Sequence, residues 1–165
     1  MKSVIIFRHG PAEEATRGQP DADRQLTKEG AEAVETAAKG MRRILQPVHL
    51  IASSPYLRAV QTAEIVARVY NGPAFIRTDA LAPGQRSKDL LGWLWQTPPN
   101  ETVVLVGHEP DLGHLASLAL AGTDWSFWHP DKAGACLLTL PDSADPGTGR
   151  LEWALKVDQL RGLAP

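Results

Sequence analysis

The stretch Val4–Gly10 reads VIIFRHG, in which four apolar residues run directly into an arginine, a histidine and a glycine. A short apolar run with this composition is typical of a buried strand. A strand that stops at Arg8 and His9 either ends at the surface or carries cationic and titratable groups to a binding site. The other strands of the chain distinguish these two interpretations.

Short apolar runs alternate with segments of helical periodicity along the whole chain. The predicted strands span residues 3–7, 48–53, 74–78, 102–108, 135–140 and 151–157. The predicted helices span residues 28–45, 55–70, 87–96 and 110–121. Strands separated by helices indicate a mostly parallel sheet with helices on both faces, and the last two strands predict an antiparallel edge. We therefore expect a three-layer α/β/α sandwich that forms one domain over residues 1–165.

Two helix starts carry recognisable signals. Thr27 precedes an acidic first turn and is the expected N-cap of the first helix. Ser54 is the expected N-cap of the second helix, because Pro55 would then occupy the first helical position, where proline is favoured.

The composition excludes several functional classes. The chain has 165 residues, 43% of them hydrophobic and 22% charged, with a net charge of −2, which is typical of a folded globular protein. This charge supplies no basic field for nucleic acid, and no apolar run approaches the length of a membrane span. The apolar run near the N-terminus is too short for a signal peptide, so we expect a cytoplasmic protein. The single cysteine, Cys136, is expected to be a small buried hydrophobe.

Three predicted strands end on similar residues. The first ends at Arg8-His9, the second is followed by Arg58 in the first turn of a helix, and the fourth ends at Gly107-His108. Each residue alone is more typical of a loop or helix surface. Since the carboxyl ends of parallel strands form the ligand site of open α/β sheets, their recurrence there predicts one shared site. Helix N-termini add N–H groups, so the expected ligand is a phosphoryl group.

The residue types suggest a mechanism. A neutral histidine presents one nitrogen lone pair, so His9 is a competent nucleophile toward phosphorus if its other nitrogen is held by an acceptor. Arg8 and Arg58 suit the charge on the equatorial oxygens of the transition state, as does His108 in its protonated form. These groups supply the electrostatics without a metal or cofactor. The spacing of His108 and His114 is not that of a zinc site.

Four motifs carry a resemblance to a known family. In order, FRHG, LTKEG, SSPYLRAVQTAEIV and VLVGHEP resemble the histidine phosphatase, or phosphoglycerate mutase-like, superfamily over roughly residues 4–122. The short chain is most similar to the SixA-type phosphohistidine phosphatases. The resemblance implies that His9 is phosphorylated transiently, that Arg8 and Arg58 clamp the phosphoryl oxygens and that His108 completes the pocket. It also implies that Arg24 is a substrate-side arginine.

One expected group is absent from the pattern. Larger members of the superfamily carry an acidic residue between the second helix and the GH strand, where this chain has only Asp79 and Asp89 without a convincing match. Glu13, Glu14 and Glu109 also lie near the motifs, and Glu109, which directly follows His108, is the choice among them for this acid and for contact with the substrate. Cleavage of an alkyl ester requires a proton in the transition state, whereas a protonated phosphohistidine leaves as neutral imidazole.

The sequence therefore predicts a metal-independent phosphatase that acts on a phosphohistidine protein through His9. Two alternatives stay open: a small-molecule phosphomonoesterase of the same family, and a non-catalytic phosphate-binding module.

Overall fold

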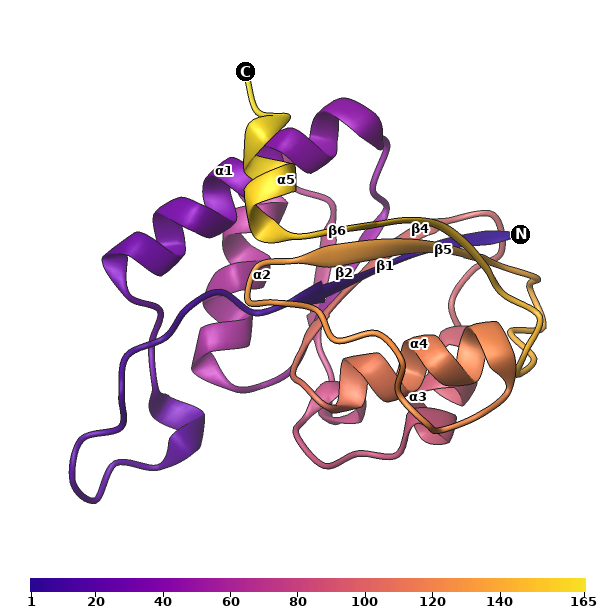
Figure 1. Cartoon of the computed structure of the whole chain (residues 1–165), viewed down its shortest axis with the longest axis horizontal. Coiled ribbons are helices and arrows are strands. Elements are labelled where there is room, and N and C mark those ends of the chain that lie inside the picture. The colour runs from indigo at the N-terminus through magenta and orange to yellow at the C-terminus, as the bar shows by residue number, and fades with distance from the viewer.

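The computed structural model describes all residues, 1–165, and its six strands form a single sheet (Figure 1). The strands are β1 (Lys2–Arg8), β2 (Leu50–Ser53), β3 (Ala74–Arg77), β4 (Thr102–Gly107), β5 (Ala135–Leu140) and β6 (Arg150–Leu155). Their order is β3-β2-β4-β1-β5-β6. The first four strands of this order are parallel, and β5 and β6 add an antiparallel edge. The predicted fold class and its antiparallel edge are confirmed.

Helices cover both faces of the sheet. They are α1 (Lys28–Ile44), α2 (Leu57–Val69), α3 (Ser87–Trp95), α4 (Asp111–Ala121) and α5 (Val157–Gly162), with short 3₁₀ turns η1 (Asp21–Asp23) and η2 (Asp79–Leu81). Figure 1 shows α1, α2 and α5 on one face and α3 and α4 on the other. None of the helices combines the length and apolar character needed to cross a membrane.

The alternation of side chains along β1 divides the core in two. Ile5 and Phe7 belong to the apolar cluster under α1, α2 and α5, whereas Val4 and Ile6 belong to the cluster under α3 and α4. All four side chains are fully buried. A strand buried on both faces reads as a continuous apolar run, which is why VIIF marks the centre of this fold.

Cys136 on β5 lies in the second of these clusters. Burial raises the pKa of its thiol. The expectation that it is a small buried hydrophobe is confirmed.

The two predicted helix starts have different outcomes. The Thr27 hydroxyl accepts a hydrogen bond from the Gly30 N–H at 2.9 Å and caps α1, as predicted. The prediction for Ser54 is wrong, because α2 begins at Leu57 with Tyr56 as its N-cap. The Ser54 hydroxyl instead accepts from the Tyr56 N–H and contacts His108, which lies in a distant part of the sequence.

The C-terminal segment also differs from the prediction. The last strand ends at Leu155, two residues early, and a six-residue helix, α5, follows it. This helix packs on α1 at Gly40, where a Cβ atom would overlap the carbonyl oxygen of Leu160. Six residues are too few to show helical periodicity, so this helix depends on its tertiary contact.

The sheet order brings three strand ends together. In the order β2-β4-β1, Arg8 lies opposite Gly107 and Ser53 lies opposite Val106. The residues that follow these strands therefore share one edge of the sheet. This is the arrangement that the recurring strand ends predicted.

Candidate active site

A cavity of about 380 Å³ lies at this edge of the sheet. Ten residues line it: Arg8, His9, Ala12, Asp21, Arg24, Arg58, Pro83, His108, Glu109 and Lys132. The six site residues predicted from the sequence are all among them. Asp21 and Lys132, a carboxylate and a further cation, were not predicted.

His9 lines this cavity in a defined orientation. Its side chain is only 6% exposed, and Nδ1 lies 2.7 Å from the carbonyl oxygen of Gly10. A carbonyl only accepts, so Nδ1 carries the proton and Nε2 presents its lone pair. Arg58 donates from Nε to this Nε2 at 3.3 Å. His9 is therefore held as the tautomer with its proton on Nδ1, and its Nε2 lone pair, which accepts from Arg58 in this structure, can attack an electrophile once that contact is released.

The turn after His9 is fixed by close packing and by α2. A Cβ atom at Gly10 would lie 2.5 Å from a methyl carbon of Val34, so only glycine fits between the strand end and α1. The Gly10 N–H donates to the Thr62 hydroxyl at 3.0 Å, and that hydroxyl donates to the Arg58 carbonyl at 2.7 Å. Thr62 therefore ties the turn that carries His9 to the helix that carries Arg58.

Burial and neighbouring cations control the protonation of His9. Burial lowers its pKa from 6.5 to about 4; the Gly10 hydrogen bond opposes this shift, and the charges of Arg58, Arg8 and Lys132 add to it. The ring is neutral near pH 7, which is the form a nucleophile requires.

His108 lies beside His9, with the two ring centroids 5.1 Å apart. Burial, His9 and Arg58 lower its pKa from 6.5 to about 3, while the carboxylate of Asp21 opposes the shift. Among the protein groups alone His108 is therefore neutral, which differs from the protonated form expected from the sequence. A phosphoryl dianion in the cavity would favour the charged form, because opposite charges raise a histidine pKa.

Two buried side-chain nitrogens of residues that line this cavity have no partner in the protein. In the whole chain only two buried side-chain nitrogen or oxygen atoms lack a hydrogen bond, Nε of Arg8 and Nδ1 of His108. Buried polar groups are rarely left unpaired, because each costs about 1–3 kcal/mol. Both atoms belong to residues that line the same cavity, so they mark a place where a ligand with acceptor oxygens fits.

Arg8 and Arg58 also have contacts that fix their guanidinium groups. Arg8 donates from Nη1 to the Pro130 carbonyl at 3.0 Å. Arg58, only 5% exposed, donates from Nη1 and Nη2 to the backbone and side chain of Asp21, at 2.9 and 3.1 Å. Its guanidinium also lies over the Tyr56 ring, 5.2 Å from the centroid.

Arg24 reaches the cavity from the long loop before α1. It donates from Nε to Asp21 at 2.8 Å and from Nη1 to the Glu13 carbonyl at 3.2 Å. Burial alone would raise the pKa of Asp21, but the hydrogen bonds and charges of Arg58 and Arg24 outweigh it and lower that pKa. Asp21 is therefore an ionised bridge between two arginines.

Glu109 lines the cavity, but both of its carboxylate oxygens are engaged. Oε1 accepts from the Gly113 N–H at 2.7 Å in the first turn of α4, and Oε2 lies 3.3 Å from Nδ1 of His129. These contacts assign Glu109 a role in holding α4 and the loop that contains His129.

No pattern in the sequence indicated that Lys132 and Asp21 would line the site. Lys132 follows Pro130 in the loop that leads into β5, and its charge contributes to the lowered pKa of His9. Neither residue follows a predicted strand end. Only the path of the two loops in space brings them to the cavity.

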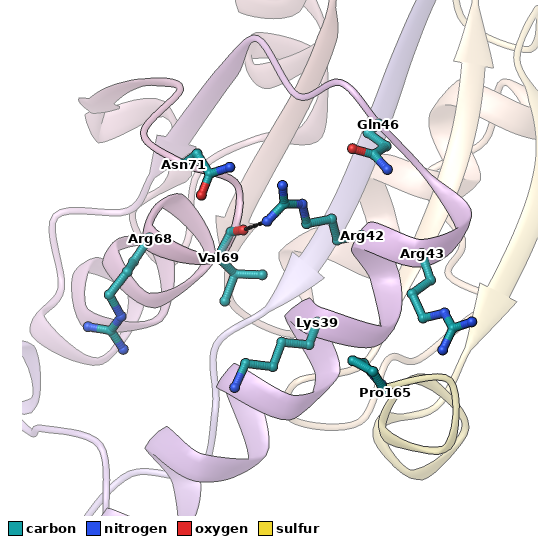
Figure 2. A pocket seen from close by; sticks show the side chains of 8 residues that line it. All are labelled: Lys39, Arg42, Arg43, Gln46, Arg68, Val69, Asn71 and Pro165. Carbon is teal, nitrogen blue, oxygen red and sulfur yellow. Dashed lines mark hydrogen bonds between the residues drawn. The ribbon is translucent and has the colours of Figure 1, made fainter.

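A second basic pocket lies elsewhere, at the C-terminal ends of α1 and α2 (Figure 2). Its volume is about 460 Å³, and its lining residues are Lys39, Arg42, Arg43, Gln46, Arg68, Val69, Asn71 and Pro165. Arg42 donates to the Val69 carbonyl at 2.7 Å, the contact drawn in Figure 2. Cations at a helix C-terminus interact favourably with the helix dipole. This pocket holds no histidine, cysteine or acid that would perform chemistry.

The residues present also do not form a metal site. No three His, Cys, Asp or Glu side chains come together in an arrangement that would hold a metal ion.

Comparison with known proteins agrees with this fold. Residues 4–83 match the histidine phosphatase superfamily (branch 1). An uncharacterized protein of Picosynechococcus sp. (strain ATCC 27264 / PCC 7002 / PR-6) is 37% identical over 133 residues, which cover 79% of this chain and 81% of the relative.

Two solved structures extend the similarity over nearly the whole chain. The protein histidine phosphatase SixA complexed with tungstate superposes with a TM-score of 0.85 at 24% identity, covering 96% of this chain and 99% of its own. A putative phosphohistidine phosphatase SixA from Agrobacterium tumefaciens gives a TM-score of 0.74 at 27% identity, covering 93% and 96%. With the matched motifs and the shared fold, the chain belongs to the histidine phosphatase superfamily, branch 1.

Proposed function

We propose that this protein is a phosphohistidine phosphatase in which His9 is the nucleophile. The observation that carries the proposal is the geometry around His9. Its Nε2 is unprotonated and accepts from Arg58, and the cavity that His9 and Arg58 line is also lined by Arg8 and His108, each of which has a buried nitrogen without a partner. Phosphoryl transfer requires a nucleophile beside donors for the phosphoryl oxygens, so this combination supports the proposal.

In the first step, Nε2 of His9 attacks phosphorus and the bond from phosphorus to the substrate breaks. His9 then carries a phosphoryl group on Nε2 and a proton on Nδ1, so its ring is cationic. The Gly10 carbonyl, 2.7 Å from Nδ1, stabilises this cation as it forms. Arg8, Arg58 and His108 contact the three phosphoryl oxygens, on which negative charge is spread in the transition state.

In the second step, water attacks phosphorus and the bond to Nε2 breaks. The ring returns to the neutral tautomer with its proton on Nδ1, and dihydrogen phosphate leaves. Both protons of the attacking water stay on the product, so the atoms and charges balance without a base in the protein.

The acids of the cavity favour a phosphohistidine substrate. Asp21 is held ionised by two arginines and presents no proton to a leaving group, and both oxygens of Glu109 are in contact with Gly113 and His129. A protonated phosphohistidine needs no such proton, because it leaves as neutral imidazole. The leaving group and the nucleophile are then both neutral imidazoles, so the free energies of substrate and phosphorylated enzyme are similar. An alkyl phosphate would release an alkoxide, which requires an acid.

The similarity to SixA proteins supports the same substrate class. One of the solved structures is described as a protein histidine phosphatase, and the other as a putative phosphohistidine phosphatase. A substrate of this class would be a protein with a phosphorylated histidine side chain.

The test is a comparison of three substrates under identical conditions: a phosphohistidine protein, p-nitrophenyl phosphate and an alkyl phosphate. We expect kcat/KM to fall in that order, because the demand for a proton on the leaving group rises. Rapid quenching into base, followed by mass spectrometry, should detect a phosphoryl group on His9. A preference for the alkyl phosphate would identify a small-molecule phosphomonoesterase. Phosphate binding without turnover of any substrate would identify a binding module.

A further inference from the structure

Ser54 is a fully buried residue that contacts His108, one of the residues of the candidate site. Its hydroxyl oxygen lies 2.7 Å from Nε2 of His108 and accepts the Tyr56 N–H at 3.2 Å. Its backbone is held by the Val106 carbonyl, which accepts the Ser54 N–H at 2.9 Å. Ser54 does not line the cavity, and its hydroxyl reaches the site through two residues, His108 and Tyr56, the N-cap of the helix that carries Arg58.

The contact between Ser54 and His108 admits two proton arrangements. In the first, the Ser54 hydroxyl donates to Nε2, and His108 carries its own proton on Nδ1. In the second, Nε2 of His108 carries the proton and donates to Ser54, and Nδ1 presents a lone pair. The same distance between heavy atoms fits both arrangements.

The surroundings of Ser54 distinguish the two arrangements. Its oxygen already accepts from Tyr56, so in the first arrangement the hydroxyl donates once and accepts once, and every polar group is satisfied. In the second arrangement the oxygen accepts twice and its own hydrogen has no acceptor in a fully buried place. Burying an unpaired donor is unfavourable, so the first arrangement is preferred.

The tautomer of His108 determines whether its Nδ1 carries a proton. This atom is buried without a protein partner, and its residue lines the cavity. As an N–H donor it complements a phosphoryl oxygen, whereas as a lone pair it would repel one. The tautomer of a neutral His108 therefore decides whether this part of the cavity attracts or repels the substrate.

We propose that Ser54 is a positioning residue that holds His108 in the tautomer whose Nδ1–H donates to the phosphoryl group. This inference deepens the proposed function and rests on it for the identity of the ligand. The tautomer itself is a property of the protein and is measured without a substrate.

The chain offers a matched control in the adjacent residue. Ser53 is also fully buried, and its hydroxyl donates to the Ser54 carbonyl at 2.7 Å without contacting His108. Ser53→Ala and Ser54→Ala each remove one buried hydroxyl and its hydrogen bonds. Only Ser54→Ala removes the group that faces Nε2 of His108.

The first measurement is the ¹⁵N spectrum of the histidine rings in the wild-type protein at neutral pH, with His108 assigned by the loss of its signals in His108→Gln. We expect the proton on Nδ1. A proton on Nε2 would overturn the proposal, whatever the variants do. In Ser54→Ala we expect a shift toward the other tautomer or a mixture, and in Ser53→Ala no change.

The second measurement is the affinity for inorganic phosphate and the turnover of p-nitrophenyl phosphate. We expect Ser54→Ala to weaken phosphate binding about tenfold or more, as loss of a hydrogen bond to a charged group does. Equal effects of Ser53→Ala and Ser54→Ala on binding would contradict the proposal. If the wild-type tautomer is as expected but no substrate is turned over, the positioning role stands and the proposed enzymatic function fails.

Discussion

Arg58 donates from Nε to Nε2 of His9 at 3.3 Å, and both side chains are almost completely buried. The arginine comes from the first turn of α2 and the histidine from the turn after β1, so the sheet order and the Thr62 link are what bring them together. The proposed nucleophile, Nε2 of His9, therefore lies next to the positive charge of Arg58, which would stabilise the phosphoryl group under attack. The predictions below follow from this arrangement and from the groups around it.

Replacement of His9 should abolish turnover and retain binding. In His9→Ala the nucleophile is lost, but Arg8, Arg58 and Lys132 still line the cavity. We expect no phosphorylated intermediate by mass spectrometry and phosphate binding that calorimetry still detects. His114→Ala on α4, outside the cavity, is the control and should keep normal activity. Full turnover by His9→Ala would remove the nucleophile assignment.

Replacement of Arg58 should lower kcat/KM because it removes a charge that stabilises the transition state. We expect Arg58→Ala to lower kcat/KM by on the order of 10²-fold or more, as loss of a charge contact to the transition state does. Arg68→Ala is the matched control, because it removes an arginine from the same helix whose side chain is 67% exposed and lies outside the cavity. Equal kinetics of the two variants would exclude a direct role for Arg58.

The two buried histidines should make the protein less stable as the pH falls. The unfolded chain binds these protons near pH 6.5, whereas the native chain binds them only near pH 4 at His9 and pH 3 at His108. Between pH 6.5 and these lower pKa values the unfolded state binds more protons than the native state. The contribution of the two histidines to the free energy of unfolding is therefore fully present above pH 6.5 and is lost as the pH falls toward about 4. Each histidine contributes a slope of up to about 1.4 kcal/mol per pH unit.

Urea unfolding between pH 7.5 and pH 5 measures this slope before most carboxylates titrate. We expect the decrease in the free energy of unfolding to be about half as large in His9→Asn as in the wild type. An unchanged slope in that variant would show that His9 is not held neutral by the fold.

Asp21 should oppose the binding of anions. Its carboxylate lines the cavity and occupies donors of Arg58 and Arg24 that also suit phosphoryl oxygens. Asp21→Asn removes the negative charge at nearly constant shape, and we expect inorganic phosphate to bind roughly threefold to tenfold more tightly at low salt. Asp23→Asn, in the same 3₁₀ turn but outside the cavity, should have little effect. Weaker binding in Asp21→Asn would show that Asp21 instead holds Arg58 in place.

Lys2 should contribute to stability and not to activity. Its side chain is only 1% exposed, and Nζ donates to the Leu94 carbonyl at 2.7 Å and to the Thr97 carbonyl and hydroxyl after the end of α3. Lys2→Met keeps the apolar stem and removes all three of these hydrogen bonds, although the Leu94 carbonyl still accepts from the N–H and hydroxyl of Thr97. We expect a loss of about 2–3 kcal/mol in the free energy of unfolding by urea, with kcat/KM unchanged. Lys39→Met, which removes an exposed ion pair with Glu35, should cost less than about 1 kcal/mol.

The strands and the long helices could be predicted from the sequence. So could the shared position of four residues at one edge of the sheet: Arg8, His9, Arg58 and His108. These features follow from local rules. Burial on two faces makes a strand continuously apolar, a helix repeats every 3.6 residues, and parallel strands end at the same edge.

The further groups that reach the cavity could not be predicted, because they depend on how the folded chain runs in space. Asp21 and Lys132 arrive on loops whose paths no local pattern encodes, and Ser54, expected to cap a helix, contacts His108 across 54 positions of sequence. The same holds for the neutral state of His108, which depends on burial and on charges from other elements. Local patterns specify the elements because they depend on neighbouring residues. Protonation, loop contacts and unpaired donors depend on atoms that meet only when the chain is folded.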